Sequence, residues 1–136
     1  MGTAFLLGMI LTAAVQSSSI TTSLIVPLVA AGVISLQKAY PFTLGANIGT
    51  TITAMLASLA TVGADGGAAS TIGVTVAFAH LMFNIFGVVI FLPLRRVPIY
   101  LATRLSNVAA ENKKWAFLFI ILVFFLLPLL VILLIR

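Results

Sequence analysis

The polar side chains most able to bind a ligand or to react lie together near the start of the sequence. They form the segment Gln16–Ser23, in which seven of the eight residues are polar. The segments Gly2–Val15 before them and Leu24–Leu36 after them are almost wholly apolar. A polar group in hydrocarbon costs roughly 2–7 kcal/mol unless it finds a partner. Irregular backbone at membrane depth must be buried in protein or line a water-filled cavity. This cluster, which begins Gln-Ser-Ser-Ser, is therefore predicted to bind something polar.

A second group of small and polar residues lies in Leu44–Thr53, which holds two glycines, one amide and three hydroxyls. Glycine lets the backbone approach a ligand closely, and Asn and Thr supply neutral oxygens. The pattern predicts a broken helix at residues 41–61 whose unwound centre faces the first cluster. Gly45 and Gly49 also form a small-xxx-small motif, for which helix packing is the alternative interpretation. The adjoining amide and hydroxyls favour a site.

Broken helices place partial charges at their ends. A helix that begins near Ile20 presents free N–H groups and its positive dipole end to an anion, and serine hydroxyls can donate to the same oxyanion. Carbonyls freed at the end of Gly2–Val15, with oxygens of Gln16 and the threonines, suit a small hard cation such as sodium. No carboxylate lies inside a predicted span, and His80 is the only histidine. A serine nucleophile would lack a base, so the residues predict a secondary transporter and not an enzyme.

The composition places the chain in a membrane. It is 62% hydrophobic and 7% charged, with a mean hydropathy of +1.32, whereas soluble domains carry about 25% charged residues. The absence of cysteine excludes disulfides and thiolate metal sites. The net charge of +5 does not indicate nucleic acid as a partner, because the basic residues cluster beside one hydrophobic segment. We expect an all-α polytopic protein of the cell membrane, with residues 1–136 forming one transmembrane domain.

The first 37 residues have two interpretations. A membrane helix needs about 20 apolar residues, so Gly2–Val15 is too short to span, and the segment after it is marginal. Either one interrupted helix spans the membrane, or residues 1–37 form a re-entrant hairpin with Gln-Ser-Ser-Ser at its tip. The topology below favours the hairpin, with Met1 on the cytoplasmic side.

Charge sets the expected topology. Residues 95–114 form a basic, cytoplasmic loop by the positive-inside rule; its cations are Arg95, Arg96, Arg104, Lys113 and Lys114. One span at residues 71–94 then places residues 63–67, with Asp65, outside, and the broken helix returns Lys38 to the cytoplasm. Residues 115–136 form the last spanning helix, anchored by Trp115 and kinked at Pro128.

Two features of the second half have structural alternatives. His80 and Asn84 lie four residues apart and share one helix face. An interhelical hydrogen bond is the favoured role of His80, and a ligand or proton relay is the alternative. The stretch around Tyr100 and Arg104 is amphipathic, which suits an interfacial helix whose charges meet lipid headgroups.

Specific motifs recur in a fixed order along nearly the whole chain: Gln16–Ser19, Thr22-Ser23, Pro27, Gly32–Ser35, Lys38–Pro41, Thr43–Thr51, His80, Phe83–Ile85, Leu92-Pro93, Arg96, Pro98-Ile99, Phe124–Leu126 and Pro128-Leu129. This series resembles the type II sodium-dependent phosphate cotransporters. The resemblance implies sodium-coupled symport of inorganic phosphate, with sodium as coupling ion and no other cofactor. It implies a substrate site at Gln16, Ser17, Ser18 and Ser19. It also implies a sodium region formed by Gln16, Ser17, Asn47, Thr50 and Thr51.

The family's members resemble two inverted repeats, each with a Gln-Ser-Ser-Ser hairpin, that enclose sodium and phosphate. This chain resembles only the second repeat and carries one such signature. Either another chain supplies the first half, or two copies pair in opposite orientations, or the chain is a fragment. The basic loop argues against dual topology, so a first-repeat partner is expected. A non-transporting membrane partner subunit, or a transporter of another oxyanion coupled to sodium or protons, is the alternative function.

Overall fold

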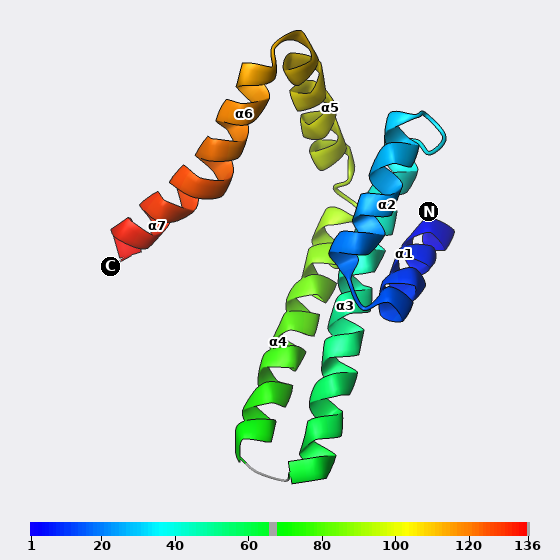
Figure 1. Cartoon of the computed structure of the whole chain (residues 1–136), viewed down its shortest axis with the longest axis vertical. Coiled ribbons are helices and arrows are strands. Elements are labelled where there is room, and N and C mark those ends of the chain that lie inside the picture. Colours follow the sequence, from blue (N-terminus) through cyan, green and yellow to red (C-terminus); the bar gives the residue numbers. More distant parts are fainter. Residues whose placement is uncertain (66–67, 136) are drawn as a thin grey trace. The chain divides into compact units, whose positions relative to one another are not determined.

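The computed structural model describes the backbone of residues 1–65 and 68–135, and the side chains of residues 1–62 and 71–135. Every regular element in this part of the chain is a helix, as predicted (Figure 1). The helices are α1 Gly2–Val15, α2 Ser18–Ala30, α3 Leu36–Asp65, α4 Ala68–Phe91, α5 Arg96–Glu111, α6 Lys113–Ile121, the π-helical turn η1 Leu122–Leu126, and α7 Leu127–Ile135. Residues 66–67, in the loop predicted to lie outside, are not among the described residues.

The helices divide into two compact units, Met1–Arg95 and Arg96–Arg136. The first holds α1 to α4 with every buried side chain of the described residues, and the second holds α5 to α7. The candidate polar clusters all lie in the first unit. The prediction of a single transmembrane domain stays a prediction.

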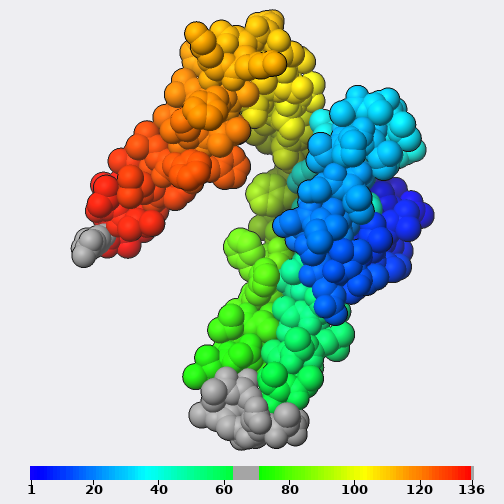
Figure 2. Space-filling view, viewed as in Figure 1, coloured from blue at the N-terminus to red at the C-terminus, as the bar shows by residue number. Residues whose placement is uncertain are grey.

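Helices α1 and α2 form a hairpin. The chain reverses at Gln16 and Ser17, so that α2 runs back against α1 (Figure 1), and the two pack side by side over α3 (Figure 2). The helices have 14 and 13 residues. At about 1.5 Å per residue, each is shorter than the hydrocarbon core of a bilayer, which is about 30 Å thick. The structure thus has a hairpin and not one interrupted helix; its re-entry into a bilayer stays a prediction.

Helix α3 corrects the broken helix predicted at residues 41–61. It is continuous from Leu36 to Asp65 through Pro41, Gly45 and Gly49, with no unwound centre. Glycine inside a helix costs only about 1 kcal/mol relative to alanine, which close packing can offset. Gly45 and Gly49 permit close packing of another helix on α3. The alternative interpretation, a small-xxx-small packing motif, therefore accounts for them.

Helix α1 lies directly against the backbone of α3. A methyl group added to Gly8 would collide with the carbonyl oxygen of Phe42, and one added to Gly45 with that of Phe5. One added to Gly49 would collide with the carbonyl oxygen of Met9. Because α1 residues 5 and 9 meet α3 residues 45 and 49, the two helices run in the same direction. Small residues permit this close approach, the usual route to affinity between helices in lipid.

Three helices in the described residues are long and apolar enough to cross a membrane: Leu36–Val62, Thr71–Phe91 and Lys113–Ile135. Helix α4 packs along α3, and the Tyr40 hydroxyl donates a hydrogen bond to the carbonyl oxygen of Phe91 at 3.4 Å. These apolar helices make the chain a membrane protein.

The second unit begins with the segment predicted as a basic connection between spans, residues 95–114. Most of that segment is the helix α5, as the amphipathic stretch suggested. Asn112 begins α6 by accepting the Lys114 N–H on its side-chain oxygen at 3.0 Å. The π-helical turn η1 lies about one turn before Pro128, and the kink predicted at Pro128 stays a prediction. Proline offers no N–H to the carbonyl four residues before it, and a π-helical turn accommodates that loss.

Candidate functional site

The hairpin tip is built by two residues with non-helical backbone. Gln16 adopts the left-handed conformation, φ 58° and ψ 24°, and its N–H bonds the Thr12 carbonyl at 2.7 Å, which ends α1. Ser17 is extended, φ −149° and ψ 109°, and its Oγ accepts the Ile20 N–H at 3.3 Å, which starts α2. Serine is a favoured residue at this capping position. The motif therefore ends one helix and begins the next within two residues.

The turn leaves backbone C=O groups, which are partly negative, and backbone N–H groups, which are partly positive, without hydrogen-bond partners. Among the described residues, no hydrogen bond reaches the carbonyls of Ala13, Ala14 and Val15, and none leaves the N–H groups of Ser18 and Ser19. The first set carries the negative end of the α1 dipole, and the second carries the positive end of the α2 dipole. One tip thus offers carbonyl oxygens to a cation and N–H groups to an anion.

The serine hydroxyls add to the anion side of the tip. A hydroxyl has one donor hydrogen and two acceptor lone pairs, so Ser17 can cap Ile20 and still donate to a ligand. Ser18 is half-buried and Ser19 exposed, and neither side chain has a hydrogen bond within the part of the chain that the structure describes. Thr21 and Thr22 instead donate to the Ser17 and Ser18 carbonyls at 2.9 and 2.7 Å. Three serine hydroxyls therefore remain able to donate.

Thr12 is a polar residue that the sequence analysis missed. It is 0% exposed, and its Oγ has no hydrogen-bond partner in the described residues. It lies one turn before Gln16 and against α3, where a methyl group added to Gly49 would lie 2.9 Å from its Cβ. The sequence did contain a signal for this residue, because a hydroxyl four residues before Gln16 lies on the same side of the helix as Gln16. A buried hydroxyl without a partner lowers the stability of the folded protein by about 1–3 kcal/mol. A ligand that bonds to the Thr12 hydroxyl would remove this penalty.

Replacing Thr12 by valine is expected to stabilise the ligand-free chain by about 1 kcal/mol, because an unpaired hydroxyl becomes a methyl group. Thr21 is the matched control, since it is also 0% exposed but donates to the Ser17 carbonyl. Thr21→Val should lower the free energy of unfolding by a similar amount. Thermal unfolding in detergent without sodium measures both changes. A loss of stability in Thr12→Val equal to that in Thr21→Val would show that Thr12 is satisfied in the folded chain.

The threonine hydroxyls predicted to bind sodium from the second cluster, those of Thr50 and Thr51, donate hydrogen bonds within their own helix. Thr50 donates to the Ala46 carbonyl at 3.3 Å and is half-buried. Thr51 donates to the Ile48 carbonyl at 2.8 Å and is 0% exposed. Each hydroxyl oxygen retains lone pairs for a cation, but the freed backbone carbonyls expected at this level of α3 are not present. The contacts of Gly49 with Met9 and Thr12, continued along both helices, place Gln16 between the levels of Thr53 and Leu56, about two to six residues beyond the two threonines.

Asn47 does not face α1. At about 100° per residue, it lies about 160° around α3 from both Gly45 and Gly49, which contact α1. Its side chain is exposed. By the same count Thr51 lies about 160° around α3 from Gly49 and only about 40° from Asn47. The structure therefore brings Gln16 and the three serines together at the tip, and the grouping of Thr50, Thr51 and Asn47 with them stays a prediction.

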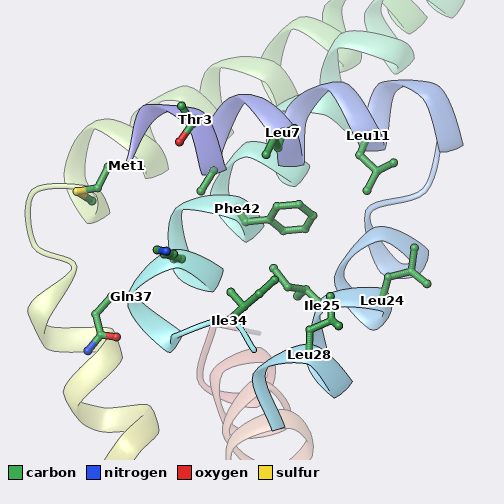
Figure 3. A pocket seen from close by; sticks show the side chains of 12 residues that line it. Met1, Thr3, Leu7, Leu11, Leu24, Ile25, Leu28, Ile34, Gln37 and Phe42 are labelled. Carbon is green, nitrogen blue, oxygen red and sulfur yellow. The ribbon is translucent and has the colours of Figure 1, made fainter. Parts of the chain in front are cut away.

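An apolar cavity of about 410 Å³ opens between α1, α2 and the start of α3 (Figure 3). Leu7 and Leu11 of α1, Leu24 and Leu28 of α2, and Phe42 of α3 point into it. It lies at the open end of the hairpin and contains none of the predicted site residues. Thr3, Gln37 and Lys38 also line it, but most of its wall is apolar and suits hydrocarbon more than ions, so the candidate site is the tip and not this cavity.

The favoured role of His80 is not observed. Asn84 donates to the His80 carbonyl of its own helix at 3.3 Å, and the His80 side chain is exposed, with no hydrogen bond to another helix among the described residues. No hydrogen bond of the His80 side chain to a possible relay group is present among the described residues either, so the ligand or relay alternative stays a prediction.

An all-helical membrane protein whose hairpin presents free carbonyls and free N–H groups at one tip has the features of an ion-coupled transporter. The sequence profile of the Na+/Pi-cotransporter family matches residues 2–132. The chain belongs to this family, which confirms the resemblance to the type II cotransporters and makes it a relative of transporters and not of enzymes.

Named relatives agree with the family. Sodium-dependent phosphate transport protein 2B of Bos taurus is 45% identical over 130 residues, and the human protein of that name is 44% identical over 128. Sodium-dependent phosphate transport protein 2C of Mus musculus is 46% identical over 128 residues. Each match covers 93% of this chain but 18% to 21% of the relative, so the chain spans about a fifth of the length of these relatives. No solved structure matches the chain.

Proposed function

We propose that the chain supplies one repeat of a sodium-coupled symporter of inorganic phosphate, in a multi-pass protein of the cell membrane. The observation that carries this proposal is the Gln16–Ser17 junction, where α1 ends and α2 begins within two residues. Free carbonyls and free N–H groups then lie beside each other, so one tip serves a cation and an anion together. The names of the relatives, all sodium-dependent phosphate transport proteins, support this choice of ions.

On the anion side, phosphate accepts hydrogen bonds from the N–H groups of Ser18 and Ser19 and from the hydroxyls of Ser17, Ser18 and Ser19. Each hydrogen bond to a charged group contributes about 1.5–3 kcal/mol. The dipole of α2 adds to this attraction at its N-terminus. Gln16 donates or accepts through its amide, which places it between the two ions.

On the cation side, sodium takes neutral oxygens from the α1 carbonyl end, with Gln16 and Ser17. Thr50 and Thr51 contribute hydroxyl oxygens from α3, and the unpaired Thr12 hydroxyl contributes one from within α1. Exposed Asn47 completes the sodium region from a face that a second repeat covers. That repeat comes from a first-half partner or from another copy of this chain, and the hairpin re-enters the bilayer to hold the tip at mid-depth.

The test is uptake of labelled phosphate into proteoliposomes under an inward sodium gradient, with potassium as the comparison. The chain is reconstituted alone and together with a first-repeat chain. Ser18→Ala should raise the phosphate concentration for half-maximal uptake about tenfold, whereas Ser23→Ala, exposed and without a hydrogen bond among the described residues, should leave it unchanged. Uptake by the chain alone would indicate that copies of it complete the site.

Two outcomes decide between the alternatives. Folded protein without uptake in either reconstitution favours the non-transporting membrane subunit, in which the polar residues serve only packing. Uptake of sulfate in preference to phosphate, or uptake driven by a proton gradient, favours a transporter of another oxyanion or with another coupling ion.

A further inference from the structure

Helix α5 has a narrow apolar face that the described residues do not cover. Val97, Leu101, Leu105 and Val108 lie within an arc of about 80° around the helix. Three of these side chains are largely exposed: Val97 is 55% exposed, Leu101 60% and Val108 44%. No residue of α5 is buried. A helix with so distinct an apolar face needs an apolar partner.

Positive charge lies along one side of that face and at both ends of α5. Arg104 lies at its edge, where its Nε donates to the Tyr100 hydroxyl at 2.9 Å and its guanidinium carbon lies 5.2 Å from the Tyr100 ring centre. The segment from Arg95 to Trp115 carries five basic residues against one acidic residue, Glu111. Cations at the border of an apolar face reach headgroup phosphates while their stems remain on apolar surface.

The neighbouring elements in the sequence place α5 at a membrane surface. Thr71–Phe91 before it and Lys113–Ile135 after it are each apolar and long enough to span. The second span begins with two lysines and a tryptophan that is 56% exposed, the residue types that anchor helix ends at the interface. A polar helix of 16 residues between two spans therefore has a bilayer surface directly beside it.

We propose that α5 is an interfacial helix that binds anionic phospholipid. Its apolar face enters the boundary between headgroups and acyl chains, and Arg96, Arg104, Lys113 and Lys114 bind the phosphate groups of anionic lipids. Because these side chains are positive and the phosphate groups are negative, the partner of the apolar face is an anionic leaflet and not a segment of protein. This placement does not depend on ion transport by the hairpin.

The experiment uses the full chain in vesicles, with a single tryptophan as reporter. Trp115 is the only tryptophan, so Trp115→Phe gives a background into which Leu101→Trp or Ser106→Trp is added. Leu101 marks the apolar face and Ser106 the opposite side. We expect brominated acyl chains to quench the tryptophan at position 101 and aqueous iodide to quench that at position 106. Equal iodide quenching at both positions would overturn the proposal.

Lipid selectivity is measured with the position 101 reporter in phosphatidylcholine vesicles. Brominated phosphatidylglycerol should quench at least about twofold more than the same fraction of brominated phosphatidylcholine at low salt, because each basic residue near the surface favours anionic lipid. The ratio should fall to about one in about 1 M salt, where charges are screened, and in a variant with the four cations changed to glutamine. Equal quenching by the two lipids at low salt would overturn the proposal. Loss of the preference in inorganic phosphate, but not in sodium chloride of the same ionic strength, would also overturn it, in favour of a free-anion site.

Discussion

Gly45→Val is expected to detach α1 from α3 and to lower the free energy of unfolding by about 3 kcal/mol. Any side chain at Gly45 meets the carbonyl of Phe5, and a backbone atom cannot move aside as a flexible side chain can. Overpacking of this kind typically costs 1–3 kcal/mol. A helix of 14 residues has little stability of its own, and α3 is the element against which α1 packs most extensively. Because the site tip follows α1 directly, phosphate uptake should be lost as well.

Gly73→Val is the matched control for this prediction. A methyl group added to Gly73, in α4, meets nothing within 4 Å, so the same substitution there should change stability by less than about 0.5 kcal/mol. Thermal unfolding in detergent and hydrogen exchange of the α1 amides measure both variants. Unchanged exchange in α1 of Gly45→Val would contradict the close backbone packing of α1 on α3.

Ser17→Asp should lower phosphate affinity by about 100-fold while the hairpin stays folded. Aspartate caps a helix as well as serine does, so the bond to the Ile20 N–H is kept. It also places a negative charge beside the proposed anion. Two unit charges about 4 Å apart repel by about 4 kcal/mol at the effective dielectric of a protein surface, which is more than enough for this loss. The added carboxylate should leave sodium affinity unchanged or raise it.

Ser17→Asn separates charge from capping. Asparagine has the shape of aspartate and is an equally good cap, but it is neutral. Phosphate binding in the two variants, measured with sodium present, gives the effect of the charge alone. Equal phosphate affinity in Ser17→Asp and Ser17→Asn would mean that Ser17 acts only as a cap and that the anion binds elsewhere.

The sequence predicted the tip because its signal is local. Seven polar residues between two apolar runs too short to span predicted a break near Gln16, and the topology from charge favoured a hairpin over an interrupted helix there. The all-helical class and the last two spans follow from composition and length in the same way. The position of the break is therefore a local signal, whereas the Ser17 cap of α2 comes from the structure alone.

The errors concern features that depend on distant residues. Gly45 and Gly49 are consistent both with a broken helix and with close packing, and only the position of α1 decides between them. The burial of Thr12 likewise depends on α3 lying over it, which no local pattern shows. Asn47 is adjacent in sequence to the packing glycines but lies on another face, so its proposed place in the sodium region depends on a second repeat that no local pattern shows.

The central claim is that the first N–H groups of α2 hold the transported anion, and hydrogen exchange tests it without any substitution. The amides of Ser18 and Ser19 have no acceptor among the described residues, so they should exchange rapidly in the ligand-free protein. Sodium and phosphate together should slow the exchange of a peptide that covers these residues. Potassium phosphate should leave it fast, and peptides from α4 should not change. Fast exchange at Ser18 and Ser19 in sodium phosphate, in an assembly that transports phosphate, would contradict the account.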